Sequence, residues 1–432
     1  WRASRSQNDV ILECDEVDAC VGGASEACAA EYTGPLCGVC RDSYAKFGDN
    51  CLRCPSVMEN MAILVAIAIV FIGFILFLIK SALLSWKSQK SISAAVFKIM
   101  INFLQTVAFL GDFRTRWPST LRVLFGMASS SNGFSTRFFS IQCAFGWSFF
   151  DSVLVAMLVP LFVVTVPTAL LCGNYYVRKC VGSLKTKRWK VFSRRIWVSV
   201  LVLIFFTHPS VTSTVLEVFA CRNIDGVAYL AADMSLACYT ASHVRWMIAA
   251  GVFFVVYVVG VPVGGGFLLW RQREVLHTAE GRRRYAFLVS GFLPNRYYWE
   301  MVILVRKSAI ITIKVLLKTN PVAQVYAAVW VVALALFVHM KASPFAFSIL
   351  TSMEMLSLVV TFVILMASQL YYADELGGSD TEVVNSPFHS VLTIFLVLLL
   401  LGSTGYMLAV AARQKLRKMR HKLPRVVWWI CR

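Results

Sequence analysis

The cysteines give the clearest chemical prediction in this sequence, and about half of them lie near its start. Seven of the 13 cysteines fall within residues 1–57. Two Cys-x-x-Cys pairs, Cys37 with Cys40 and Cys51 with Cys54, have a spacing that indicates zinc in a cytosolic protein but disulfides in an oxidising compartment. This segment has little apolar content for a core of its own, so disulfides must supply much of its stability. Because we expect the segment outside the cell, we favour disulfides over zinc and expect no metal site. The disulfide candidates are Cys14, Cys20, Cys28, Cys37, Cys40, Cys51 and Cys54, with Cys143, Cys221 and Cys238 further along the chain.

Ionisable side chains inside long apolar runs form the second set of interest. Each costs roughly 2.5 to 3.5 kcal/mol on insertion into lipid, so each marks a site that function or structure requires. Glu300 and Lys307 lie two helical turns apart and share one face, and Lys314 extends the row by two more turns. We expect Glu354 to pair with Arg306 or Lys307. Two interpretations stay open: the network lines a polar pathway or gate, or it is a set of salt bridges that orients helices.

Enzyme motifs are missing from the sequence. It contains no HExxH, no kinase signature and no nucleophile beside a base. The glycines at 264–266 follow no strand pattern and precede no Gly-Lys-Ser/Thr, which excludes a P-loop and a dinucleotide fingerprint. We therefore expect neither enzyme activity nor a cofactor.

The composition indicates a protein that lives in lipid. Of 432 residues, 58% are hydrophobic and only 15% are charged, against roughly 25% charged in soluble domains, and the mean hydropathy is +0.68. A net charge of +19 could suggest nucleic acid. The Lys and Arg residues lie in blocks between apolar runs, however, and this placement is typical of membrane topology signals, so we expect no nucleic-acid partner.

Nine apolar stretches are candidate membrane spans, because a bilayer core about 30 Å thick needs roughly 20 apolar residues as helix. Two of them, 98–112 and 301–317, are weaker, and without both of them seven spans would remain. In the fourth stretch, His208 and Pro209 are expected to break the helix. The predicted fold is an all-α polytopic transmembrane bundle with the spans 61–79, 98–112, 152–177, 196–216, 246–270, 301–317, 322–338, 355–373 and 386–412.

Charge placement predicts the orientation of these spans. Short loops rich in Lys and Arg stay in the cytoplasm, which places the N-terminus outside, the C-terminus inside and all ten candidate disulfide cysteines on the outer side. One outer loop breaks the rule, with Arg114, Arg116, Arg122 and Arg137. We predict a multi-pass plasma-membrane protein with an extracellular cysteine-rich domain (1–57), a transmembrane domain (58–412) and a basic cytoplasmic tail (413–432). The basic inner loops could also bind anionic lipids.

Two sets of sequence motifs resemble those of known protein families. The stretch from Gly34 to Cys40, followed by Tyr44, resembles the EGF-like and ephrin-receptor-like cysteine modules of extracellular proteins. Further phrases resemble a family of protist and algal polytopic proteins, in which cysteine-rich repeats precede a membrane region likened to that of TRP channels. Those phrases are Lys98 to Gln105, Trp117 with Pro118, Cys221 to Cys238, Gly260 to Pro262, Gly291 to Leu293, Tyr298 to Glu300, and Arg306 with Lys307.

The resemblance implies a TRP-like region, so our first functional expectation is a cation channel or sensory conduit whose acidic outer loops attract cations. Such a channel holds a re-entrant pore helix and filter before its last helix, and the stretch 374–387 is short for both. The alternative is a cell-surface receptor or adhesion protein whose ectodomain binds an extracellular ligand. A transporter or lipid scramblase is a further alternative, although no inverted repeat is visible. A homo-oligomer is a candidate assembly for this chain.

Overall fold

The computed structural model describes residues 2–3, 11–12, 14, 19–21, 28–47, 50–85, 92–113, 115, 117–129, 139–180, 189–224, 226–377 and 387–420. Several predictions fall outside these residues. They concern most of the basic loops after the first and third predicted spans, much of the acidic stretch 374–387, the tail beyond Arg420, and Arg114, Arg116 and Arg137 of the loop that breaks the charge rule.

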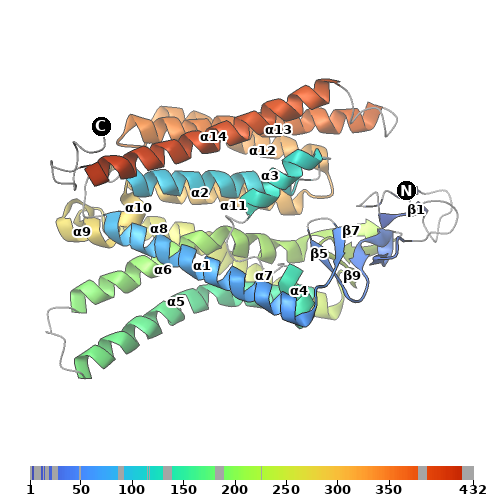
Figure 1. Ribbon diagram of the computed structural model, residues 1–432, viewed down its shortest axis with the longest axis horizontal. Coiled ribbons are helices and arrows are strands. Elements are labelled where there is room, and N and C mark those ends of the chain that lie inside the picture. Colours follow the sequence, from blue (N-terminus) through green and yellow to red (C-terminus); the bar gives the residue numbers. More distant parts are fainter. Residues whose placement is uncertain are drawn as a thin grey trace, which may run out of the picture.

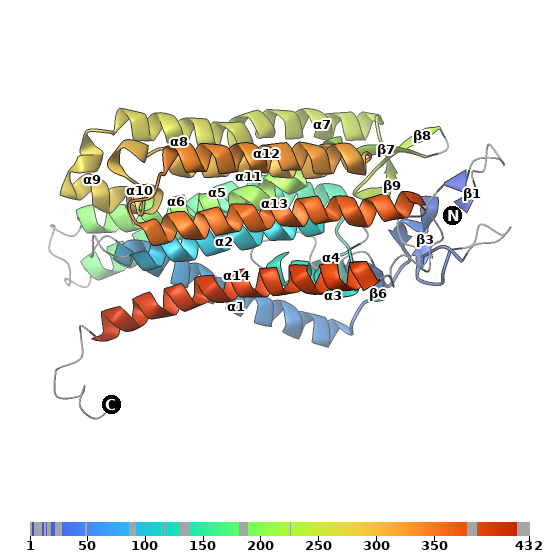
Figure 2. The ribbon, with the colours of Figure 1, turned by 90° about the horizontal axis from the view of Figure 1, so that it is seen from above.

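Long helices dominate the described residues and lie side by side as a bundle (Figures 1 and 2). They are α1 (Val57–Ser85), α2 (Ile92–Gly111), α3 (Ser119–Ser129), α4 (Phe139–Phe145), α5 (Phe149–Cys180), α6 (Trp189–Leu216), α7 (Ala241–Phe253), α8 (Gly260–Arg271), α9 (Ala279–Arg284), α10 (Ala286–Val289), α11 (Trp299–Leu316), α12 (Pro321–Ala342), α13 (Ser348–Gly377) and α14 (Pro387–Arg420). Short turns η5 (Glu217–Phe219), η7 (Val275–His277) and η8 (Pro294–Arg296) join some of them, and the π-helical turn η6 (Phe254–Val259) links α7 to α8.

Seven helical segments in the described part of the chain are long and apolar enough to cross a membrane, so the chain is a membrane protein. They are Ala94–Gly111, Phe149–Ala169, Phe192–Phe219, Ala241–Arg271, Pro321–Ala342, Ser348–Tyr371 and Pro387–Gln414. They differ from the seven-span alternative, because Ala94–Gly111 is among them. The remaining two predicted spans coincide with α1, whose described apolar stretch is Val57–Val70, and with the charged helix α11. The count of nine and the orientation stay predictions.

The N-terminal module consists of short strands at one end of the bundle, which we call the module end (Figure 1). Its antiparallel pairs are β1 (Arg2–Ala3) with β2 (Ile11–Leu12), β3 (Tyr32–Thr33) with β4 (Val39–Cys40), and β5 (Tyr44–Phe47) with β6 (Asn50–Arg53); the turn η2 (Pro35–Cys37) lies between β3 and β4. The helix α14 ends at the opposite end of the bundle, the end at which α9 and α10 also lie (Figures 1 and 2).

Two helices that begin at the module end have matched N-terminal caps. The Ser56 hydroxyl donates to Glu59 Oε2 at 2.8 Å, while the Glu59 N–H points back to the Ser56 hydroxyl at 3.4 Å. Ser148 and Asp151 repeat this arrangement at the start of α5. Such reciprocal capping satisfies backbone N–H groups that have no partner within the helix. The starts of α1 and α5 are therefore fixed locally by sequence.

The prediction that His208 and Pro209 break their helix was wrong, since α6 runs through both. The buried side chain of His208 instead supports a neighbouring helix. Pro262 has no N–H to donate to the Val258 carbonyl four residues earlier, and His208 Nε2 lies 3.3 Å from that oxygen. A carbonyl accepts only, so Nε2 carries the proton. Partner groups of this kind are what allow proline inside membrane-depth helices.

A three-stranded antiparallel sheet interrupts the predicted all-α bundle between α6 and α7. It contains β7 (Cys221–Ile224), β8 (Val227–Leu230) and β9 (Asp233–Ala237), in the order β7-β8-β9. The sheet lies at the module end, next to the N-terminal strands (Figure 1). It therefore provides a surface on which the module can rest.

The main hydrophobic core lies among α2, α3, α11, α12, α13 and α14. A second core joins α5 and α6 to α7, η6 and the three-stranded sheet. Helices α5, α12 and α14 are mostly exposed in the single chain, as apolar helices in contact with lipid or a second copy would be. Helix α11 contributes to the main core and also packs against α6 and α8.

Replacing Gly291 by alanine is expected to lower the free energy of unfolding by about 2–3 kcal/mol. Gly291 has a φ of +91°, and an added Cβ would lie 2.9 Å from the Ala95 Cβ atom and 3.2 Å from Leu350 Cδ1. Gly264→Ala is the matched control, because Gly264 is helical and has open space where its Cβ would be. Unfolding titrations in mixed micelles compare the two variants, and equal effects would contradict this account.

Candidate functional site

The predicted row of charges lies on α11, with its members buried inside the chain. Glu300 and Lys307 are each 4% exposed and Lys314 is 8% exposed. The helix bears apolar residues around the row, so it packs against α2, α6 and α12 and presents the charges to them. Burial of this degree requires that each charge have a partner.

Glu300 pairs with a residue of α2. Lys98 Nζ lies 2.5 Å from Glu300 Oε2 and also donates to the Phe287 carbonyl at 3.3 Å. The same ammonium lies 4.6 Å from the centre of the Phe292 ring, within the range of a cation–π contact. This cluster joins the starts of α2 and α11 to α10.

Arg306 pairs with Glu354 of α13, a partner that the sequence suggested. Arg306 Nη2 donates to Glu354 Oε1 at 2.8 Å. The Glu354 side chain is 1% exposed and the Arg306 side chain 12% exposed. This pair is therefore almost entirely removed from solvent and joins α11 to α13.

The hydrogen-bond partners of Lys307 are both neutral. Its ammonium donates to Asn102 Oδ1 and to Gln105 Oε1, each at 2.6 Å. Both amides belong to α2, one helical turn apart. Among the described residues, no carboxylate forms an ion pair with Lys307. This lysine is the member of the row whose charge is least compensated.

Lys314 lies near the module end of α11 and has mixed partners. Its ammonium donates to Asp112 Oδ2 at 2.8 Å and to Ser213 Oγ at 3.0 Å. It also lies 5.2 Å from the centre of the Phe109 ring. Gln324 of α12 donates to the Lys314 carbonyl at 2.7 Å. This position ties α11 to α2, α6 and α12 together.

Of the five residues of the predicted network, the structure brings only Arg306 and Glu354 into contact with each other. Glu300, Lys307 and Lys314 each contact other residues, namely Lys98, Asn102, Gln105, Asp112 and Ser213, which the predicted network did not include. These contacts hold α11 to α2, α6 and α13 and leave a cavity beside Lys307. The arrangement is compatible with salt bridges that orient helices and with a polar pathway or gate, so both interpretations stay open.

The ten candidate cysteines form five disulfides. Within the module, Cys14 pairs with Cys20, Cys28 with Cys37 and Cys40 with Cys51, and in the three-stranded sheet Cys221 pairs with Cys238. The seventh module cysteine, Cys54, pairs with Cys143 of α4, which is 89 residues away in the sequence. The bond between Cys54 and Cys143 fixes the module to the helices covalently.

Apolar packing fixes the module a second time. Leu36 lies buried against Ile224 and Met234 of the three-stranded sheet. The approach is so close that a Cβ on Gly38 would lie 2.5 Å from the Met234 sulfur. A module held both by packing and by a disulfide cannot shift without acting on the helices that follow.

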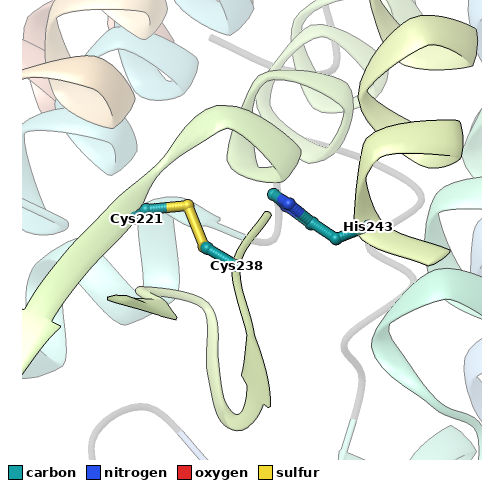
Figure 3. A group of neighbouring side chains, drawn as sticks. All are labelled: Cys221, Cys238 and His243. Carbon is teal, nitrogen blue, oxygen red and sulfur yellow. A yellow bond between two sulfur atoms is a disulfide. The ribbon is translucent and has the colours of Figure 1, made fainter. Parts of the chain in front are cut away.

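One group of residues has the composition of a metal site, namely Cys221, Cys238 and His243 (Figure 3). The two sulfurs are bonded to each other. His243 Nδ1 accepts the Tyr239 N–H at 3.0 Å, so Nε2 carries the proton and donates to the Val218 carbonyl at 2.9 Å. Each potential ligand atom already has a partner, so this group stabilises a corner of the fold rather than binding a metal.

Zinc is therefore expected to leave the unfolding temperature of the oxidised chain unchanged. His243→Ala should destabilise the chain by about 1–3 kcal/mol, because it leaves the buried Val218 carbonyl and the partly buried Tyr239 N–H without their side-chain partner. Calorimetry with and without zinc and chelator measures both effects. A rise in the unfolding temperature on zinc addition that disappears in His243→Ala would contradict the structural role.

Comparison with known proteins finds one relative of low similarity. The chain is similar to Cysteine repeat modular protein A of Toxoplasma gondii, with 24% identity over 456 residues; the match covers 87% of this chain and 14% of that protein's length. No protein-family model and no solved structure matches. The similarity and the disulfide-rich N-terminus support a cysteine-rich module followed by membrane helices. Because the chain spans a small part of that relative, the activity of the whole relative does not transfer.

Proposed function

We propose that this chain is a cell-surface sensory protein of receptor type, in which the cysteine-rich module acts on the helix bundle from outside. The observation that carries the proposal is the disulfide between Cys54 and Cys143. It joins the module to α4, and α5 begins four residues after α4 ends and runs to the opposite end of the bundle (Figure 1). A displacement of the module would therefore pull on α4 through the disulfide and, through the short connection, on α5, which reaches the opposite end of the bundle.

The proposed topology has nine spans, an extracellular N-terminus, a cytoplasmic C-terminus and a plasma-membrane location. Two features support it. The module and the end of α14 lie at opposite ends of the bundle (Figure 1), and all ten disulfide cysteines fall at the predicted outer side, where an oxidising compartment preserves disulfides. In this topology α11 is the sixth span despite its charges.

The relative supports the extracellular part of this proposal. Its name describes a modular protein with cysteine repeats. Small disulfide-stapled modules are typical of extracellular proteins that space or bind. We infer that the module of this chain carries a surface for an extracellular ligand and that the chain has no catalytic activity.

A dye on Cys180 tests the proposal. Cys180 is a free, exposed thiol at the end of α5, and Cys172→Ser with Cys431→Ser removes the competing thiols. The full chain in nanodiscs carries an environment-sensitive dye there, and a magnetic bead applies tension through a tag ahead of the module. We expect a reversible change of fluorescence under tension.

The matched control removes Cys54 and Cys143 together, so that no unpaired thiol is left. This double alanine variant should lose most of the tension response while the folded bundle remains. A wild-type chain whose dye never responds, or a response of equal size in the double variant, would overturn the proposal.

A cation conduit is the second candidate, because α11 carries buried charges at membrane depth beside a cavity whose largely apolar lining includes several polar and charged residues. It requires a pore other than the TRP type, since α13 ends at Gly377 and α14 begins at Pro387. Whole-cell currents with cation substitution test it. A cation current altered by Lys307→Ala would support conduction, and the lack of current under voltage, stretch and calcium steps would remove this candidate.

A further inference from the structure

A cavity of about 80 Å³ lies between α2, α6, α10 and α11, towards the end of the bundle opposite the module. It is large enough for several waters or a small organic group, since one water requires roughly 10–15 Å³. The α6 wall is apolar, with Val202, Phe205 and Phe206. The α2 and α11 walls combine apolar residues with the polar part of the charge network, namely Lys98, Asn102, Gln105, Glu300 and Lys307.

The charges around this cavity do not balance. Lys98 is neutralised by Glu300, and Arg306 by Glu354. Lys307 remains as a buried cation whose two hydrogen bonds go to neutral amide oxygens. A buried cation without an anionic partner is unfavourable, because the low-dielectric surroundings replace the water it has lost. An anion in the cavity would remove this imbalance.

Two hydrogen-bond donors are also left over. Asn102 is 93% buried, and its Nδ2 atom has no hydrogen-bond partner among the described residues, although its Oδ1 atom accepts from Lys307. The Lys307 ammonium has three N–H groups and uses two of them for the two amides. Buried donors without partners are rare in native proteins and indicate a bound group that the chain itself does not supply. Both donors suit an oxyanion.

We propose that this cavity binds the anionic head of an amphiphile, an oxyanion such as a lipid phosphate, with the attached apolar chain against α6. The oxyanion accepts from Lys307 and from Asn102 Nδ2. The phenyl rings and the valine of α6 receive the first methylene groups of the lipid. This inference does not depend on the proposed receptor function.

The surroundings of the cavity also favour an anionic lipid. Arg284 is exposed just before the cavity residues Ala286 and Phe287, and its guanidinium lies 5.3 Å from the Trp197 ring. Arg271 and Arg273 are exposed at the same end of the bundle. In the proposed topology this end faces the cytoplasmic leaflet, where anionic lipids are concentrated and each nearby basic residue adds about 1 kcal/mol of attraction.

Native mass spectrometry of the full chain in detergent tests the proposal, with dioleoyl phosphatidic acid as the probe. The comparison probes are dioleoyl phosphatidylcholine, which has no net charge, and inorganic phosphate, which has no apolar chain. Phosphatidic acid should bind at least about tenfold more tightly than phosphatidylcholine, because its head carries a net negative charge, whereas the phosphate charge of phosphatidylcholine is cancelled by its own choline cation, which the buried Lys307 ammonium would repel. Inorganic phosphate should not displace phosphatidic acid at equal concentration.

Two variants and a control locate the site. Lys307→Met removes the charge and Ala94→Leu fills the cavity while it keeps every charge; each should raise the dissociation constant for phosphatidic acid by about tenfold or more. Lys314→Met removes a lysine of the same helix that does not line the cavity, and its effect should stay within about twofold. The proposal is overturned if Ala94→Leu binds as the wild type does, if Lys314→Met is as harmful as Lys307→Met, or if inorganic phosphate competes as well as the lipid.

Discussion

Glu354→Leu is expected to lower the free energy of unfolding by about 3–5 kcal/mol, because it leaves the guanidinium of Arg306 buried without its counter-charge. The carboxylate of Glu354 is 1% exposed and accepts from Arg306 at 2.8 Å. Water cannot replace it there. Steric trapping of the chain in bicelles, or titration with a denaturing detergent, measures the change.

A double variant separates the value of the pair from the cost of an unpaired charge. Replacing a buried ion pair by apolar residues of similar volume is often neutral or stabilising, so Arg306→Met with Glu354→Leu should recover most of the lost stability. The pair of Lys314 with Asp112, in which only the lysine is buried, gives a second comparison. Asp112 is 59% exposed where it pairs with Lys314, and Asp112→Asn should cost at most about 1 kcal/mol. A double variant as unstable as Glu354→Leu alone would refute the explanation.

The same variants bear on the role of the charge row. If the row only orients helices, the double variant should keep the tension response of the dye at Cys180. If the row belongs to a gate or pathway, the double variant should be stable and yet lose function. Stability and response, measured on one protein, therefore decide between the two interpretations that the sequence left open.

The charge row on α11 could be found from sequence because its spacing is local. Glu300, Lys307 and Lys314 are seven residues apart, and this period keeps them on one helical face. The stripe on α2 has a similar period, with Lys98, Asn102, Gln105 and Asp112 at intervals of four, three and seven residues. The pairing of the two stripes joins residues about 200 positions apart, and no local pattern contains that information.

The cysteines show the same limit. Their types and compartment predicted disulfides among ten cysteines but no pairing, although seven cysteines cannot all pair within the module and at least one needs a partner elsewhere. Which loop cysteine supplies that partner depends on how the helices pack, since α4 must lie beside the start of α1 for Cys143 to reach Cys54. Connectivity follows from the fold here and not from the spacing of the cysteines.

The three-stranded sheet is indicated in the sequence by a turn motif rather than by its apolar stretches. The dipeptide Asp225-Gly226 is typical of two-residue hairpin loops, and it lies in the sequence between β7 and β8, which pair antiparallel. A search for membrane spans treats such a stretch as a loop. The prediction that Pro209 breaks its helix failed because it considered the helix alone. In the structure α6 packs against neighbours on several sides, and this packing outweighs the loss of one backbone hydrogen bond.

Removal of the bond between Cys54 and Cys143, as Cys54→Ala with Cys143→Ala, is expected to destabilise the chain by about 2–5 kcal/mol. The bond closes a loop of 89 residues. In the chain-entropy account such a loop is worth close to 5 kcal/mol, but α1 and α2 lie within this loop and lipid restrains them in the unfolded state as well, which lowers the gain. Cys221→Ala with Cys238→Ala, which opens a loop of 17 residues, provides the comparison.

The two double variants should differ in what they loosen. Hydrogen exchange of the first should rise in β3 to β6 and in α4 while α2, α11 and α13 keep their protection, because the main core contains no part of the module. The second should loosen the sheet β7 to β9 and, through Leu36, the face of the module that rests on it. If exchange in the module were unchanged in the first variant, packing alone would hold the module, and the covalent route from module to α5 would lose its role in transmission.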